Sequence, residues 1–121
     1  MLSRGKHVLR MDLKDSKDKE KLLKEVIPNI NVLLESYRPG VMEKLGISPE
    51  VCHQLNPILI YVRLSGYGNK PSRYSQLAGH DGNYLSLSGI LNKFRRIHKN
   101  SNPVPPSNFL ADFSYGSLFC F

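Results

Sequence analysis

The stretch Ile58-Leu59-Ile60-Tyr61-Val62-Arg63-Leu64 is the strongest strand signal in the chain. This short run of branched and aromatic residues begins directly after Asn56-Pro57, a pair that ends a helix. Before that pair, Ser48-Pro49-Glu50 is typical of a helix start, with serine as the cap and proline in the first helical position. The sequence therefore predicts a helix that leads into a strand over 58–64.

Earlier in the chain, the sequence predicts two more strands with a helix between them. His7 to Leu13 is a short, partly apolar run that we predict to be a strand, and Asn31 to Glu35 is a second strand. Between them, Asp15 or Ser16 caps a helix that ends at Pro28-Asn29 and carries one apolar stripe, formed by Leu22, Leu23, Val26 and Ile27. The order βαβαβ predicts an α/β fold, with a parallel sheet and helices packed on it.

The composition changes after Gly68, where a polar loop follows. We predict that Asp81 caps a helix reaching Leu91, that 92–107 is an exposed loop, and that an apolar helix runs from Pro106 to Phe121. The chain is thus divided into a βαβαβ part, residues 1–68, and a part made of a loop and helices, residues 69–121. Both parts are assigned to a single domain.

Length and charge limit the possible functions. The chain has 121 residues, enough for one modest core, and a formal net charge of +7. A polyanionic partner is therefore expected; the absence of a basic motif with interleaved aromatics argues against nucleic acid. No apolar run approaches the ~20 residues of a membrane span. The two cysteines lack metal-ligand spacing and favour a reducing compartment.

Polar residues follow each predicted strand at its carboxyl end. In open α/β sheets, ligands bind in the crevice outside these ends, so the following loops form a candidate site for an anion or a nucleotide. The residues are Asp12 and Lys14 after the first strand, Ser36, Tyr37 and Arg38 after the second, and Ser65, Gly66 and Gly68 after the third.

Four blocks of the sequence carry a family resemblance: LESYRPGVMEKL at 34–45, LSGYG at 64–68, LAGHDGNY at 77–84 and NFLADF at 108–113. From Arg4 to Phe121 the chain resembles the α-methylacyl-CoA racemases, which belong to the CaiB/BaiF-type family III CoA-transferases. The resemblance implies part of a Rossmann-like CoA-binding domain, incomplete at both ends. It places substrate and CoA contacts at Met11, Asp12, Leu13, Lys14, Ser36, Tyr37, Arg38, Lys44, Gly79, His80, Asp81, Gly82, Asn83 and Tyr84.

The resemblance also implies two catalytic residues, His80 and Asp112. An imidazole with a pKa of ~6.5 takes and returns a proton near neutral pH, and Asp112 supplies a carboxylate for the opposite face of a carbon. From the sequence alone, a structural cap is the alternative role for each residue. Two features depart from the family pattern: Gly82 replaces a bulky apolar residue, and the segment from Lys93 to Pro106 is longer and more basic.

The reaction implied is epimerisation of 2-methyl-branched acyl-CoA thioesters through an enolate, in the metabolism of fatty acids and bile acid precursors. No cofactor is implied beyond the CoA of the substrate. The family further implies an interlocked homodimer located in peroxisomes or mitochondria. Two alternatives stay open: a family III CoA-transferase, and an inactive fragment or interaction protein. We expect the 121-residue chain alone to be inactive.

Overall fold

The computed structural model describes residues 4–94, 101–106 and 110–112. The chain forms two compact units, Met1–Leu64 and Ser65–Phe121, each of which is described by itself. In the first unit the order of elements is α1 (Ser16–Lys21), a π-helical turn (Leu22–Val26), a 3-10 turn (Ile27–Asn29), β1 (Val32–Glu35), α2 (Val41–Lys44), α3 (Pro49–Leu55) and β2 (Ile60–Arg63). The second unit contains α4 (Asp81–Leu87) and a 3-10 turn (Ile90–Phe94).

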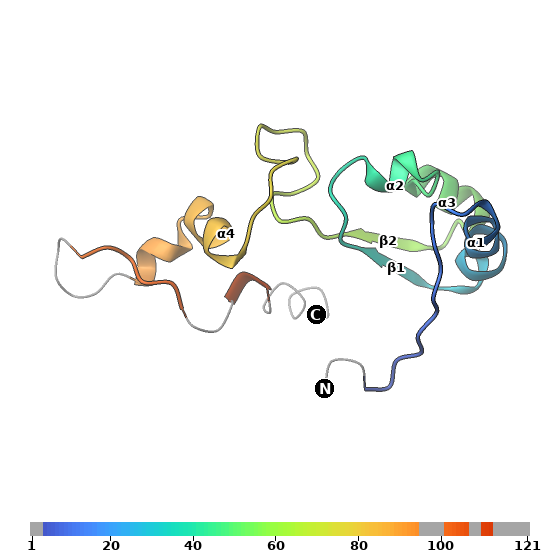
Figure 1. Cartoon of the computed structure of the whole chain (residues 1–121), viewed down its shortest axis with the longest axis horizontal. Coiled ribbons are helices and arrows are strands. Elements are labelled where there is room, and N and C mark those ends of the chain that lie inside the picture. Colours follow the sequence, from blue (N-terminus) through green and yellow to red (C-terminus); the bar gives the residue numbers. More distant parts are fainter. Residues whose placement is uncertain (1–3, 95–100, 107–109, 113–121) are drawn as a thin grey trace. The chain divides into compact units, whose positions relative to one another are not determined.

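The two strands confirm the predicted parallel pairing. Val32 is opposite Ile60 and Glu35 is opposite Arg63, and the strands lie side by side (Figure 1). The ladder continues at both ends, where the Ile60 N–H donates to the Asn31 carbonyl at 2.9 Å and the Leu64 N–H donates to the Glu35 carbonyl at 2.9 Å. Because β1 and β2 are parallel, both end at the same edge, and the loops after Glu35 and Arg63 begin there.

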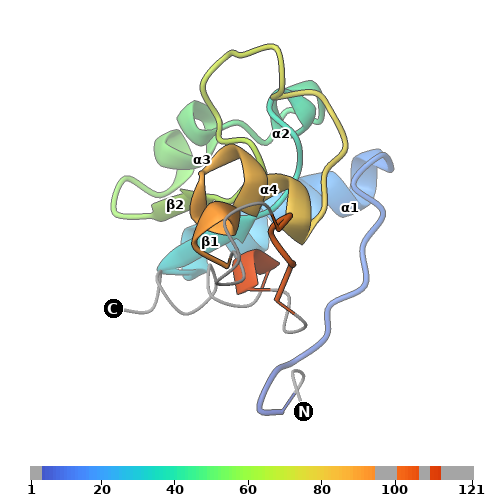
Figure 2. The same cartoon turned by 90° about the vertical axis from the view of Figure 1, so that its left-hand side faces the viewer.

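The predicted strand over His7 to Leu13 is wrong. Residues 4–12 contain no strand, and Figure 2 shows this blue segment as an extended coil leading toward α1. Val8 and Leu9 are exposed, and no neighbouring strand among the described residues supplies backbone partners. A strand that lacks such partners leaves its ladder of hydrogen bonds unmade. The described sheet therefore contains β1 and β2 alone.

The core of the first unit lies on one face of the strand pair. Its buried residues are Ile27, Met42, Ile47, Cys52 and Leu59, and Leu33 and Tyr61 from the strands pack against them. In both views α2 and α3 lie on the same side of the strands (Figure 1 and Figure 2). The opposite face carries Val32, Leu34 and Ile60, which are exposed in the described part of the chain.

The capping predictions have mixed outcomes. Ser48 caps α3, with its hydroxyl accepting from the Val51 N–H at 3.4 Å, and Asn56 ends the helix as predicted. The choice between Asp15 and Ser16 falls to Asp15, whose carboxylate accepts from the backbone N–H groups of Lys17 and Asp18. The short helix α2 was not predicted; its N-cap is Gly40, which has φ 88°.

The start of α4 corrects another prediction, because the N-cap residue is His80 and not Asp81. The His80 N–H donates to the Asn83 side chain at 2.9 Å, and the His80 carbonyl accepts from the Asn83 N–H at 2.8 Å. The Asp81 carboxylate has different partners, given below. The helix ends at Leu87, and Leu91 lies in the following 3-10 turn. Of the predicted helix from Pro106 to Phe121, residues 110–112 are helical, Pro106 is not, and 107–109 and 113–121 lie outside the described residues.

Candidate functional site

The turn after β1 carries three of the predicted CoA contacts, Ser36, Tyr37 and Arg38, all of them exposed. Its start is fixed by Glu35, whose Oε2 accepts from the Tyr37 N–H at 2.7 Å. The Arg38 carbonyl then accepts from the Val41 N–H at 3.2 Å, which leads into α2 and its last residue, Lys44. One short segment therefore presents two exposed cations, Arg38 and Lys44. This arrangement suits a phosphate-bearing ligand.

The predicted contacts Met11 to Lys14 lie in the bend before α1. The Asp12 N–H donates to Asp18 Oδ2 at 2.8 Å, and Asp12 Oδ1 accepts from the Lys14 N–H at 2.9 Å. The Asp12 side chain therefore shapes this turn, while Lys14 is exposed. The segment does not follow a strand, so the strand-end argument that predicted it does not apply to the described fold.

In the second unit, the loop after β2 packs against the segment that carries His80. Tyr84 donates its hydroxyl to the Gly79 carbonyl at 2.6 Å, and the rings of Tyr84 and Tyr67 meet edge to face, with their centroids 5.1 Å apart. A Cβ on Gly66 would lie 2.4 Å from ring atoms of Tyr84, and one on Gly79 would lie 2.6 Å from the Tyr67 hydroxyl. Both glycines are therefore required for the close approach of the aromatic rings.

This packing gives a prediction for a matched pair of glycines in the second unit. Gly79→Ala should displace the Tyr84 and Tyr67 rings and destabilise the unit by about 1–3 kcal/mol, the usual range for overpacking. Gly82→Ala should stabilise α4 by about 0.5–1 kcal/mol, because a Cβ there meets nothing within 4 Å and alanine is the better helix former. Thermal unfolding followed by tyrosine fluorescence measures both variants. Equal shifts for the two would contradict the packing argument.

The two predicted catalytic residues are connected through a buried carboxylate. His80 and Asp112 are both exposed, whereas Asp81, next to His80, is only 5% exposed. Its Oδ1 accepts from the backbone N–H groups of Ala111 and Asp112, at 2.5 and 3.0 Å. Asp81 therefore anchors the segment of Asp112 to the start of α4, although the two lie 31 residues apart. Asp81 was predicted as a helix cap and as a CoA contact, and its role as an anchor was not predicted.

An open pocket of about 580 Å³ lies beside this anchor. Apolar and aromatic side chains, with glycine backbone, form most of its lining, including Tyr67, Tyr84, Leu87, Ile90 and Leu110. Apolar pockets of this size are typical of small-molecule sites. In the described ranges, no group of three or more His, Cys, Asp or Glu residues is arranged to hold a metal ion. The helices in those ranges are also too short or too polar to cross a membrane.

Sequence reasoning also missed three charged residues, Glu35, Glu43 and Arg63. Glu35 and Arg63 end the two strands and are register partners, so the pairing of the predicted strands could have brought them together. Nothing in the sequence pattern pointed to Glu43, because α2 was not predicted. The hydrogen bond to Glu35 raises the pKa of Arg63, and partial burial opposes that shift.

Comparison with known proteins finds a matching family and relatives with similar sequences. The sequence model of CoA-transferase family III matches residues 1–121. The chain is 50% identical over 119 residues to the alpha-methylacyl-CoA racemase of Mus musculus and 49% identical over 119 residues to that of Homo sapiens. Each match covers 98% of this chain and 30% of the relative, so the chain spans less than a third of either.

A solved structure agrees with the described fold. The crystal structure of a hypothetical protein from Mycobacterium tuberculosis matches with a TM-score of 0.81 and 30% identity, over 95% of this chain and 32% of that one. This similarity confirms the predicted α/β class.

Proposed function

Because this chain belongs to CoA-transferase family III, we propose that it forms part of an enzyme that epimerises 2-methyl-branched acyl-CoA thioesters. The observation that carries the proposal is the anchor between Asp81 and Asp112. It ties the backbone of the segment that carries Asp112 to Asp81, the residue next to His80, so that the segments of the two proposed acid–base groups are joined. A reaction that moves a proton between the two faces of a carbon needs such a pair.

The proposed chemistry is abstraction of the proton α to the thioester carbonyl. The thioester acidifies this carbon, and loss of the proton leaves a planar enolate. His80 works on one face and Asp112 on the other, and their roles as acid and base exchange between the two enantiomers. No cofactor takes part beyond the CoA of the substrate itself. General acid–base catalysis of this kind contributes about 10²- to 10⁴-fold in rate.

The proposed binding of CoA uses the exposed cations of the first unit. Arg38 and Lys44 contact phosphate groups, and Lys14 adds a further contact. Met11 to Leu13, Ser36 and Tyr37 are further proposed contacts in the first unit. In the second unit, the proposed substrate contacts are Gly79 to Tyr84. The apolar pocket beside α4 suits the branched acyl group, because its lining offers few polar partners.

A CoA-transferase is the second candidate, favoured by the description of the matching family. In that reaction an aspartate, here Asp112, attacks the thioester carbonyl and forms a mixed anhydride as the C–S bond breaks and the CoA thiolate leaves. The thiolate then attacks the aspartyl carbonyl and releases the first acid, and the same two steps in reverse pass CoA to the second acid. The basic side chain of His80 favours the epimerase, since transferases of the family usually lack a histidine there. Work in lipid metabolism, an interlocked homodimer and a peroxisomal or mitochondrial location, which the sequence resemblance implies, are further parts of the proposal.

The test of the proposal is an assay on a chimera, in which this chain replaces the matching segment of the mouse racemase. Incubation of one 2-methylacyl-CoA epimer in deuterated water should yield the other epimer with deuterium at the α-carbon. Formation of a new thioester with an added free acid, without inversion, would instead support the transferase.

Binding of CoA by the 121-residue chain gives a separate prediction. Arg38→Ala should weaken the affinity for CoA by about 1–3 kcal/mol, the scale of a charge-assisted hydrogen bond. The matched control is Lys21→Ala, which removes the same charge from the exposed surface of α1. Titration calorimetry measures both variants. Equal losses of affinity in the two variants would show that net charge alone attracts CoA, and Arg38 would then not be assigned to the site.

A further inference from the structure

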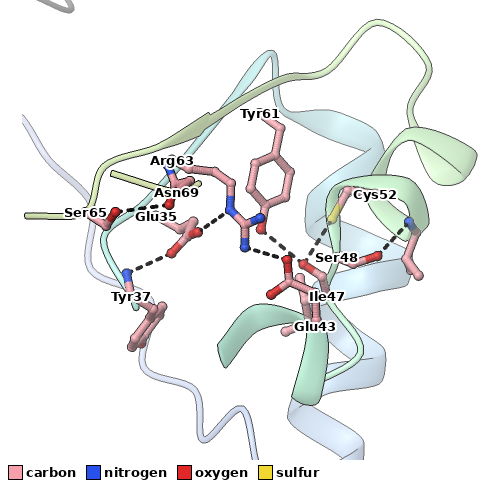
Figure 3. Close-up of polar contacts among 11 residues, drawn as sticks. Glu35, Tyr37, Glu43, Ile47, Ser48, Cys52, Tyr61, Arg63, Ser65 and Asn69 are labelled. Atoms are coloured by element: carbon pink, nitrogen blue, oxygen red, sulfur yellow. Dashed lines mark hydrogen bonds and ion pairs between the residues drawn. The ribbon is translucent and has the colours of Figure 1, made fainter. Parts of the chain in front are cut away.

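Arg63, the last residue of β2, lies between two carboxylates in the first unit (Figure 3). Its Nε donates to Glu35 Oε1 at 2.8 Å, and its Nη2 lies 2.7 Å from Glu43 Oε1. The guanidinium also lies over the ring of Tyr61, 5.9 Å from its centroid. Glu35 is 5% exposed, so this ion pair is largely removed from water and weakly screened.

The first carboxylate leads directly to the turn that carries Arg38. While Glu35 Oε1 accepts from Arg63, its other oxygen accepts from the Tyr37 backbone N–H at 2.7 Å. Figure 3 shows this chain of contacts from Arg63 through Glu35 to Tyr37. The guanidinium therefore fixes the orientation of the carboxylate, and the carboxylate fixes the backbone one residue before Arg38.

The second carboxylate leads to Lys44 in the same way. Glu43 belongs to α2, a helix of only four residues, in which Lys44 comes next. A helix this short has little stability of its own and takes its position from tertiary contacts. Its contact with Arg63 is one of these, together with the buried Met42. One guanidinium thus holds both segments on which the exposed cations Arg38 and Lys44 lie.

We propose that Arg63 is a positioning residue, which sets the spacing of Arg38 and Lys44 for a phosphate-bearing ligand. This inference rests on the proposed function in so far as CoA is that ligand. Arginine suits the role because its planar guanidinium can donate to two carboxylates at once, whereas a lysine ammonium is a single point charge. Arg63 acts through Glu35 and Glu43. The ligand itself is contacted by the two exposed cations, Arg38 and Lys44.

Glu43→Ala separates this proposal from simple attraction between charges. The change makes the chain more positive, so net charge alone predicts tighter binding of CoA. Loss of the α2 contact predicts weaker binding instead, by about fivefold or more. The matched control is Glu20→Ala, which removes an equally charged side chain from an exposed ion pair with Lys24. Titration of the 121-residue chain with CoA measures both, and binding to Glu43→Ala that is tighter than or equal to the unmodified chain would overturn the proposal.

Amide hydrogen exchange tests the positioning without any ligand. In Arg63→Met, exchange at the Tyr37 N–H should be about tenfold faster or more, because its acceptor Glu35 loses its anchor. The amide of Leu64, which donates to the Glu35 carbonyl, should stay protected. Lys24→Met is the control, with the same loss of charge from an exposed pair. Where Arg63→Met does not fold, Arg63→Lys keeps the charge but not the fork, and faster exchange is expected at the Tyr37 or the Lys44 amide.

The two experiments fail in different ways. If the unmodified chain does not bind CoA, the proposed ligand is wrong, and the exchange result alone still decides whether Arg63 positions the two segments. If exchange at Tyr37 and at Lys44 is unchanged in the Arg63 variants, the positioning role is overturned whatever the affinity for CoA. A double-variant cycle with Arg38→Ala adds a last check, since additive losses would show that Arg63 does not act through the Arg38 turn.

Discussion

In the chimera with the mouse racemase, His80→Ala is expected to slow epimer interconversion by about 10²- to 10⁴-fold, because one face of the α-carbon loses its acid and base. Exchange of the α-hydrogen with deuterium should persist for one epimer, since Asp112 still serves its own face. Asp112→Asn should show the complementary pattern, with exchange kept for the other epimer. Chiral chromatography of the acyl products and mass spectrometry of deuterium measure the two effects separately.

His7→Ala is the control for this experiment, because His7 is an exposed histidine in the segment before α1. It should leave the interconversion near the rate of the unmodified chimera. The two-base assignment fails if either the His80 or the Asp112 variant keeps near-normal interconversion. It also fails if both variants lose exchange on the same face, because a single group would then perform both proton transfers.

The part of the fold that could be predicted depends on local signals. The strand over 58–64, the serine cap of α3 and the parallel pairing follow from runs of a few residues and from their order. The strand over His7 to Leu13 failed because a strand exists only with a partner, and a short apolar run does not show whether one is present. The cap of α4 failed because Asp81, a good cap by type, is engaged with backbone groups about 30 residues away.

In the candidate site, as in the fold, local patterns predicted individual residues but not the contacts between distant segments. The block from Leu77 to Tyr84 pointed to His80 by its pattern, and Asp112 came from a second block. What joins them is the Asp81 carboxylate, a contact between distant segments for which no local pattern exists. The same holds for the contact of Arg63 with Glu43, which lies 20 residues earlier in the chain on a helix that was not predicted, whereas the strand pairing could have brought Arg63 to Glu35. Sequence patterns thus predicted the proposed chemical groups, whereas the groups that hold them became visible only in the folded chain.

The largest loss of stability is expected from Asn56→Asp in the first unit. Asn56 is 6% exposed, and its Nδ2 donates to the carbonyls of Ile27 at 3.0 Å and Ile30 at 2.8 Å. These bonds join the end of α3 to the segment before β1. A carboxylate of the same shape would turn an acceptor toward both carbonyls and leave them without a donor. Each buried group left unsatisfied costs about 1–3 kcal/mol, so the loss at pH 7 should be about 3 kcal/mol or more.

The loss of stability in Asn56→Asp should also depend on pH, and the two carbonyls determine whether it grows or shrinks as the pH rises. They disfavour the ionised form of the new aspartate, so its pKa in the folded state is raised above the unfolded value of about 3.9. Such a group has its full stability below the unfolded pKa and loses it as the pH rises through the folded pKa. Asn56→Asp should therefore be less destabilised near pH 4 than at pH 7, in urea unfolding followed by circular dichroism.

Asn29→Asp is the control that isolates burial in this prediction. Asn29 also donates from Nδ2 to a backbone carbonyl, that of Glu25 at 2.8 Å, but it is exposed. Water replaces the lost partner there, so the change should cost about 0.5–1.5 kcal/mol, the net value of one such bond. Equal losses for the two variants, or a loss for Asn56→Asp that does not change between pH 4 and pH 7, would contradict the role assigned to Asn56. A large, pH-dependent difference would show that one buried amide holds α3 and the start of β1 together, at the opposite end of the strand pair from Glu35 and Arg63.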